Sequence, residues 1–113
     1  MSKLIINKKI ISKSYKSMDT IWQQAKGLMF QNKVKRPLIF KFKESQKIPL
    51  HMWFVFCTID VLYLDEDKTI VEMKQEFKPF AYYSPKKKAK YVIELKENTI
   101  KNNNIKLKQK VTF

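Results

Sequence analysis

The segment that decides the fold is Leu50–Cys57, whose sequence LHMWFVFC is apolar at nearly every position. Successive residues of a β-strand point to opposite faces of the sheet, so a strand this uniformly apolar has to be covered on both sides. We therefore predict a central strand at Leu50–Cys57, in the middle of the hydrophobic core.

Strand patterns flank this segment on both sides. Before it, the segment that follows a turn signal at Arg36-Pro37 has Leu38, Phe40 and Phe42 on one strand face and Lys41 and Lys43 on the other. After it, Asp60–Leu64 and Thr69–Met73 are both rich in strand-forming residues. The four charged residues Asp65–Lys68 separate them, so this part of the chain predicts a hairpin with a polar tip.

The C-terminal part continues the alternation. Tyr91–Leu95 and Ile105–Phe113 each have a strand-like alternation of side chains, which predicts two further strands. Between them, Asn98-Thr99 is expected to start a short helical turn that ends at Asn102–Asn104.

The N-terminal part predicts one strand and one helix. Leu4–Ile11 has two β-branched clusters around a polar centre and is interpreted as a strand. Ser14 or Ser17 can cap a following helix, and Gly27 lies near its expected end. The residues that would form its apolar side are Ile21, Trp22, Ala25, Leu28 and Met29.

Together these patterns predict six or seven strands and one substantial helix. We expect a mainly β (α+β) fold in which a compact, mostly antiparallel sheet closes into a barrel-like domain with the helix packed on it. A chain of 113 residues with a hydrophobic share of 44% is long and apolar enough for one core, so residues 1–113 are expected to form a single domain.

The net charge of +14 raises the question of a polyanionic partner. A basic surface can attract nucleic acid or another polyanion. However, Arg36 is the only arginine, whereas recognition of phosphates and guanine edges favours the forked guanidinium. We therefore favour the interpretation that the excess of lysine is a solvated surface that reflects genome composition, with a polyanion-binding surface as the alternative.

The scarcity of metal-binding residue types excludes several classes of site. Cys57 is the only cysteine and His51 the only histidine, so neither an internal disulfide nor a structural zinc cluster can form. The acidic tip Asp65–Asp67 lacks the further ligands and the glycine bend of a calcium loop. We expect no metal and no cofactor.

Localisation is predicted from what the N-terminal segment lacks. Residues 1–12 contain no apolar core of the length that a signal peptide needs, and no run in the chain is long enough to span a bilayer. The sequence thus predicts a cytoplasmic protein without a membrane span.

The segment Phe80–Lys88, with the sequence FAYYSPKKK, is the first candidate for a binding site. Tyr82 and Tyr83 can stack on bases or sugars while Lys86 and Lys87 hold phosphate. The alternative is a loop that its aromatic residues pin to the sheet, with a fringe of lysines in water.

A second candidate lies around the apolar strand. His51 and Trp53 share a strand face, and Asp60 opens the next strand, so a histidine–carboxylate pair could act as a general base. In the alternative interpretation, His51 is satisfied by the backbone and Asp60 caps the turn. Cys57 is expected to pack as a small hydrophobic residue. The combined tentative ligand-binding set, without any assigned catalytic residue, is His51, Trp53, Asp60, Tyr82, Tyr83, Lys86 and Lys87.

Five motifs in order give the chain a family resemblance. They are Ala25–Phe30 (AKGLMF), His51–Phe56 (HMWFVF), Ile59–Asp65 (IDVLYLD), Lys78–Phe80 (KPF) and Tyr91–Leu95 (YVIEL). Over about residues 20–113 the chain resembles the family known as domain of unknown function 192, especially its short archaeal-type members. The resemblance implies a compact, β-rich, barrel-like domain with a packed helix, and no established activity.

The departures from the family pattern are local. Lys26 and Gln31 flank the Gly-Leu-Met where the family usually has arginine, and Thr58 stands where a proline is common. Asn98-Thr99 and Lys108-Gln109 replace a Gly-Thr and a Gly-Asp turn. Because lysine tolerates a left-handed backbone poorly, we expect a rearranged last turn within an intact fold.

Three functional hypotheses remain open from the sequence. The first is a non-enzymatic binding or accessory module, for an unknown ligand or protein partner, with its surface where the 80–88 loop meets the His51–Trp53 strand. The second is non-specific nucleic-acid binding through the lysine-rich surface. The third is a small hydrolase-like enzyme that uses His51 and Asp60.

Overall fold

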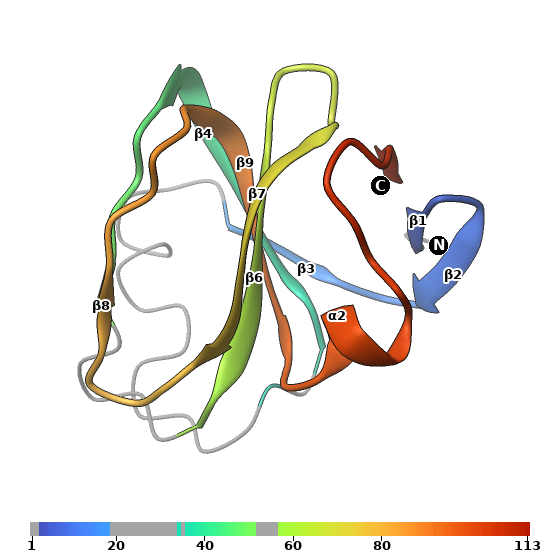
Figure 1. Cartoon of the computed structure of the whole chain (residues 1–113). Helices are drawn as coiled ribbons and strands as arrows, with labels where there is room; N and C mark the ends of the chain where they lie inside the picture. The colour runs from blue at the N-terminus through green and yellow to red at the C-terminus, as the bar shows by residue number, and fades with distance from the viewer. Residues whose placement is uncertain (1–2, 19–33, 35, 52–56) are drawn as a thin grey trace.

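The computed structural model describes residues 3–18, 34, 36–51 and 57–113. Its largest element is a five-stranded sheet in the order β3-β4-β9-β6-β7 (Figure 1). The strands are β3 (Lys16–Met18), β4 (Leu38–Gln46), β6 (Ile59–Leu64), β7 (Ile70–Phe77) and β9 (Ala89–Lys96). All neighbours in this sheet pair antiparallel except β3 and β4, which are parallel.

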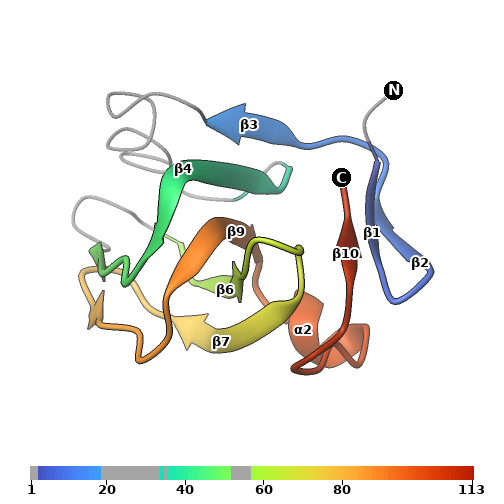
Figure 2. The same cartoon turned by 90° about the horizontal axis from the view of Figure 1, so that it is seen from above.

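A second, three-stranded sheet stands beside the first. It contains β1 (Leu4–Ile6), β2 (Lys9–Ser12) and β10 (Val111–Thr112), in the order β10-β1-β2 (Figure 2). The prediction of one strand over Leu4–Ile11 was therefore wrong, because the chain reverses at Asn7-Lys8. Both residues have positive φ, 50° and 68°, as a tight two-residue hairpin turn requires.

The five-stranded sheet is buried on both faces because side chains of β6 alternate between two clusters. Every residue of β6 is buried. The first group, here called the Tyr63 cluster, consists of Val34, Leu38, Phe40, Ile48, Ile59, Val61, Tyr63, Phe77, Ala89 and Val92. The second, the Leu62 cluster, consists of Leu4, Ile6, Ile39, Leu62, Leu64, Ile70, Tyr91, Ile93, Leu95, Ile100, Ile105 and Val111. The three-stranded sheet thus contributes to the Leu62 cluster.

The helical turn after β9 is confirmed as α2 (Thr99–Asn102), which buries Ile100 in the Leu62 cluster. Asn98 precedes it in the left-handed conformation, with φ of 69°. The strand predicted over Ile105–Phe113 is shorter than expected, because only Val111–Thr112 pairs as β10. Lys108 adopts φ of 72°, so this non-glycine residue occupies a left-handed position in the last turn.

Two further predictions are tested only in part. Leu50–His51 forms β5 and pairs with β8 (Tyr82–Tyr83) in a two-stranded sheet, so this end of the predicted central strand is outside the five-stranded sheet. Residues 52–56 lie outside the described part of the chain. The predicted helix also lies outside it from Asp19 onwards, and Ser17 belongs to β3 instead of capping a helix.

The fold class is confirmed as mostly β with mostly antiparallel pairing. Within the described ranges, α2 is the small helix and the strands form three sheets. No strand ladder among these residues closes a sheet on itself, so the barrel is not confirmed. None of the described helices is long and apolar enough to cross a membrane.

Candidate functional site

The segment Phe80–Lys88, here called the aromatic–lysine loop, is anchored to the five-stranded sheet by Glu72. Glu72 lies on β7, and its Oε1 accepts the backbone N–H groups of Lys86 at 2.9 Å and Lys87 at 2.8 Å. Its Oε2 accepts the hydroxyl of Tyr83. One carboxylate therefore fixes the loop at three donors, and charged acceptors make such bonds strong.

The ring of Tyr83 gives the loop an apolar anchor as well. Its centroid lies 6.0 Å from that of Tyr63 and 6.2 Å from that of Phe77, and Lys74 Nζ lies 5.7 Å from the ring. Burial and the hydrogen bond to Glu72 raise the pKa of Tyr83 to about 12. Tyr83 is therefore a neutral donor at physiological pH, and its role here is to hold the loop.

Other side chains of the loop face solvent. Phe80 and Tyr82 are each 56% exposed, and Lys86, Lys87 and Lys88 are exposed. A turn in which the N–H of Ala81 donates to the carbonyl of Lys78 at 3.1 Å precedes Tyr82, and Phe80 has a left-handed φ of 64°. The loop thus presents aromatic and cationic groups together from a fixed backbone.

The structure brings part of the predicted ligand set to this loop. The backbone of His51 pairs with Tyr82, and that of Leu50 with Tyr83, in the β5–β8 ladder. The main chain of the predicted His51 strand is therefore adjacent to the aromatic–lysine loop. Trp53 and the side chain of His51 lie outside what the structure describes.

Asp60 is placed elsewhere and has a structural role. Its side chain is 1% exposed; Oδ1 accepts the N–H of Glu76 at 3.2 Å and Oδ2 accepts the N–H of Ile100 at 2.9 Å. Asp60 alternates along β6 with Ile59 and Val61, so it projects to the face opposite the Tyr63 cluster. It thereby ties β7 and α2 to β6 and is not brought to the side chain of Tyr83.

Glu94 is a notable residue that the sequence reasoning missed. It is 9% exposed on β9, and its register partners are Leu38 on β4 and Val61 on β6, both in the Tyr63 cluster. Burial raises its pKa to about 7. A lone glutamate within the apolar sequence VIEL was the signal that could have identified it. A carboxyl group that titrates near neutral pH can exchange a proton there.

Cys57 packs at the edge of the Tyr63 cluster, as expected of a small hydrophobic residue. Burial, with smaller contributions from the charges of Glu94 and Glu97, raises the pKa of its thiol. The thiol is therefore held protonated, which is the reverse of what a cysteine nucleophile needs.

The acidic tip between β6 and β7 is a self-contained turn. Asp65 Oδ1 accepts the N–H groups of Asp67 at 2.9 Å and Thr69 at 3.0 Å. Across the described ranges, no three histidine, cysteine or acidic side chains gather in a way that could hold a metal ion. The carboxylate of Asp65 thus stabilises the hairpin.

Solved structures with this fold come from two bacteria. A protein of unknown function from Novosphingobium aromaticivorans superposes with a TM-score of 0.89 at 17% identity, covering 98% of this chain and 84% of that one. A proposed transcription regulator from Sinorhizobium meliloti gives a TM-score of 0.81 at 20% identity, covering 87% and 79%. At these identities the likeness shows a shared fold.

Curated relatives are uncharacterised proteins of the group UPF0127. The protein of Thermococcus sibiricus is 33% identical over 96 residues, which are 80% of this chain and 62% of that protein. The protein of Thermococcus kodakarensis is 35% identical over 81 residues, 70% of this chain and 51% of its own length. The chain thus spans only about half to three-fifths of the length of these two relatives.

Residues 5–113 match the family described as "Uncharacterized ACR", known as domain of unknown function 192. The match includes the motifs from Ala25–Phe30 to Tyr91–Leu95 that gave the resemblance. The chain therefore belongs to the family of domain of unknown function 192, as an archaeal-type member.

Proposed function

We propose that this chain is a small binding module, not an enzyme, and that the aromatic–lysine loop is its ligand-contacting surface. The observation that carries the proposal is the anchoring of the loop by Glu72, which leaves Phe80 and Tyr82 largely exposed. A loop fixed before binding loses little conformational entropy when a ligand arrives. Exposed aromatic rings on such a loop favour recognition of another flat ring.

The ligand class follows from the neighbouring charges. Lys86, Lys87 and Lys88 are exposed within a few residues of Tyr82. Aromatic rings stack on bases or sugars of any sequence, and ammonium groups bind phosphate as point charges. The ligand is therefore a molecule that carries both rings and phosphates, such as a nucleotide or a single-stranded oligonucleotide.

The test compares two polyanions. Binding of a labelled oligothymidylate is measured by fluorescence anisotropy, and inorganic polyphosphate serves as a ligand with phosphates but without rings. Tyr82→Ala should weaken oligothymidylate binding by about tenfold, because stacking contributes ~1–3 kcal/mol per base. The same substitution should leave the affinity for polyphosphate unchanged.

Matched variants separate the loop from the general surface charge. Lys87→Gln removes one ammonium from the loop, and Lys101→Gln removes one from an exposed position on α2. If the loop is the binding surface, Lys87→Gln should weaken oligothymidylate binding more than Lys101→Gln does. Equal loss in both variants, or undiminished oligothymidylate binding by Tyr82→Ala, would exclude the loop as the binding surface.

The second hypothesis, non-specific binding through the whole lysine field, is tested in the same experiment. Its supporting observation is the net charge of +14. It predicts that log affinity falls with log salt concentration with a slope of roughly 0.7 for each phosphate neutralised. It also predicts that affinity does not depend on whether the ligand carries aromatic rings. Equal affinity for polyphosphate and oligothymidylate would favour this hypothesis over the loop. A hydrolytic role for Asp60 is not proposed, since two backbone donors already occupy its buried carboxylate.

A further inference from the structure

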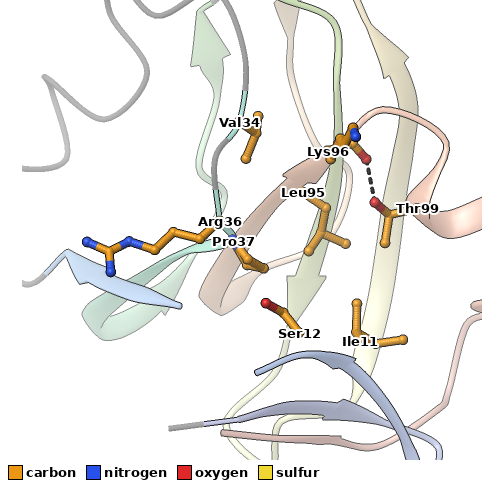
Figure 3. A pocket seen from close by; sticks show the side chains of 8 residues that line it. All are labelled: Ile11, Ser12, Val34, Arg36, Pro37, Leu95, Lys96 and Thr99. Atoms are coloured by element: carbon orange, nitrogen blue, oxygen red, sulfur yellow. Dashed lines mark hydrogen bonds between the residues drawn. The ribbon is translucent and has the colours of Figure 1, made fainter. Parts of the chain in front are cut away.

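A pocket opens at the junction between the three-stranded and the five-stranded sheets. It has a volume of about 200 Å³ and lies between the end of β2, the segment that leads into β4, the end of β9 and the start of α2 (Figure 3). No residue of the aromatic–lysine loop lines it. The volume is larger than one water molecule needs and smaller than the ~300–1,000 Å³ typical of drug-sized sites. The pocket therefore suits a small molecule or one end of a longer one.

One part of the pocket lining is hydrocarbon. Its apolar residues come from three different segments of the fold, and Val34 and Leu95 among them are buried core residues. Those that the structure describes are Ile11, Val34, Pro37 and Leu95. Such a surface favours an aliphatic group, because burial of apolar area contributes roughly 25 cal/mol per Å².

Among the described polar residues that line the pocket, the hydroxyl protons are already used and the cations remain as donors for a ligand. The hydroxyl of Ser12 donates to the carbonyl of Ser14 at 2.7 Å, and that of Thr99 donates to the carbonyl of Lys96 at 2.6 Å. The remaining polar lining residues in the described part of the chain are Arg36 and Lys96, both exposed, and none of the lining residues that the structure describes is acidic. The rim of the pocket is therefore cationic.

The position of Arg36 fits a rim residue. In Figure 3 its side chain extends away from Leu95 and leaves the pocket open. An exposed arginine can change rotamer at modest entropic cost, and its guanidinium can bind a carboxylate through two parallel hydrogen bonds. Arg36 is the only arginine in a chain with 24 basic residues. A different rotamer of Arg36 would bring its guanidinium to a planar anion at the rim of the pocket.

We propose that this pocket is a binding site for a short-chain aliphatic carboxylate, whose hydrocarbon part contacts Ile11, Pro37 and Leu95 and whose carboxylate binds Arg36 and Lys96. The charge of the rim selects the anionic head group, and the volume limits the tail. The site is independent of the aromatic–lysine loop and of the function proposed for it.

Three ligands with the same tail test the proposal. Hexanoate, hexanol and hexylamine are titrated at constant ionic strength into ¹⁵N-labelled protein and followed by NMR. Hexanoate should shift the amide signals of Ser12, Leu95, Lys96 and Thr99. It should bind at least tenfold more tightly than hexanol, because one charge-assisted hydrogen bond raises affinity by about tenfold or more. Hexylamine should bind more weakly still.

Variants test the named residues. Arg36→Ala and Lys96→Ala should each weaken hexanoate binding by about tenfold, and Ser12→Leu should block the pocket without a change of charge. Lys106→Ala, which removes an exposed charge outside the pocket, and Tyr82→Ala in the loop should bind hexanoate normally.

The outcomes that overturn the proposal are equally defined. The proposal is wrong if hexanoate does not bind, or if hexanoate and hexylamine bind with equal affinity. It is also wrong if inorganic phosphate binds as tightly as hexanoate, because the apolar lining would then contribute nothing to affinity. Unchanged affinity in Arg36→Ala, with the thermal unfolding of the variant as a check on its fold, would also overturn it.

Discussion

Glu94 makes the stability of the fold depend on pH. Burial in the Tyr63 cluster raises its pKa from 4.5 to about 7, so the folded protein binds this proton more tightly than the unfolded chain does. The resulting stabilisation is complete below pH 4.5 and is lost as the pH rises through 7. A pKa shift of this size corresponds to a change of about 3 kcal/mol in the free energy of unfolding between low and high pH.

Glu94→Gln should remove this pH dependence, because the amide keeps the shape of the neutral acid. We expect the free energy of unfolding of the variant, measured with urea, to exceed that of the wild type at pH 8 and to approach it at pH 4. Glu97→Gln, a change at an exposed position, should leave the wild-type profile nearly intact. A parallel pH profile for Glu94→Gln and the wild type would contradict the assignment.

The roles of individual carboxylates were the hardest feature to predict from sequence. Glu94 shares a strand with apolar neighbours, so its burial was detectable in the pattern VIEL. Glu72 carries no such signal, because the N–H groups it accepts are 14 and 15 residues away. Asp60 was interpreted either as the partner of His51 or as the cap of the turn before β6. Its carboxylate accepts the backbone N–H groups of Glu76 and Ile100, 16 and 40 residues away, which the sequence pattern does not reveal.

At the scale of elements, Glu72 couples β7 to the aromatic–lysine loop. Glu72→Ala should release the backbone of Lys86 and Lys87, because both amides lose their acceptor. We expect faster hydrogen exchange at these two amides and a loss of roughly 1–3 kcal/mol in the free energy of unfolding. In Glu97→Ala, which removes the same charge at an exposed position, exchange at Lys86 and Lys87 should be unchanged. Equal exchange in the two variants would show that Glu72 does not anchor the loop.

Elements rich in strand-forming residues were predicted well, and those that depend on turn geometry were not. The hairpin of β6 and β7 and the strand β9 are confirmed because β-branched and aromatic residues dominate these segments and polar turn residues bound them. The reversal at Asn7-Lys8 was missed because only one of its two positive-φ residues is an asparagine. The segment before β10 alternates in sequence, yet Lys108 turns the chain there. The local sequence pattern therefore predicts which residues are buried more reliably than it predicts where the chain turns.

At the scale of the whole molecule, the C-terminal residues join the two larger sheets. The N–H of Val111 donates to the carbonyl of Lys68 at 2.9 Å, and the N–H of Asn7 donates to the carbonyl of Lys110 at 3.0 Å. The strand β10 thus contacts the β6–β7 turn on one side and pairs with β1 on the other. Side-chain packing at Phe113 reinforces this connection.

Phe113 should therefore contribute more to stability than its place at the end of the sequence suggests. Its ring lies 5.2 Å from that of Tyr91. Lys68 Nζ lies 3.9 Å from the centroid of the Phe113 ring and donates a hydrogen bond to the backbone oxygen of Phe113 at 3.0 Å. Phe113→Ala should lower the free energy of unfolding by about 2 kcal/mol, through lost packing and a lost cation–π contact. Urea unfolding measures the difference, and Leu107→Ala, at a residue that is 51% exposed, should change it by less than ~0.5 kcal/mol. If the two variants lose the same stability, the sheets are joined without the aromatic ring, and the backbone ladder of β10 alone connects them.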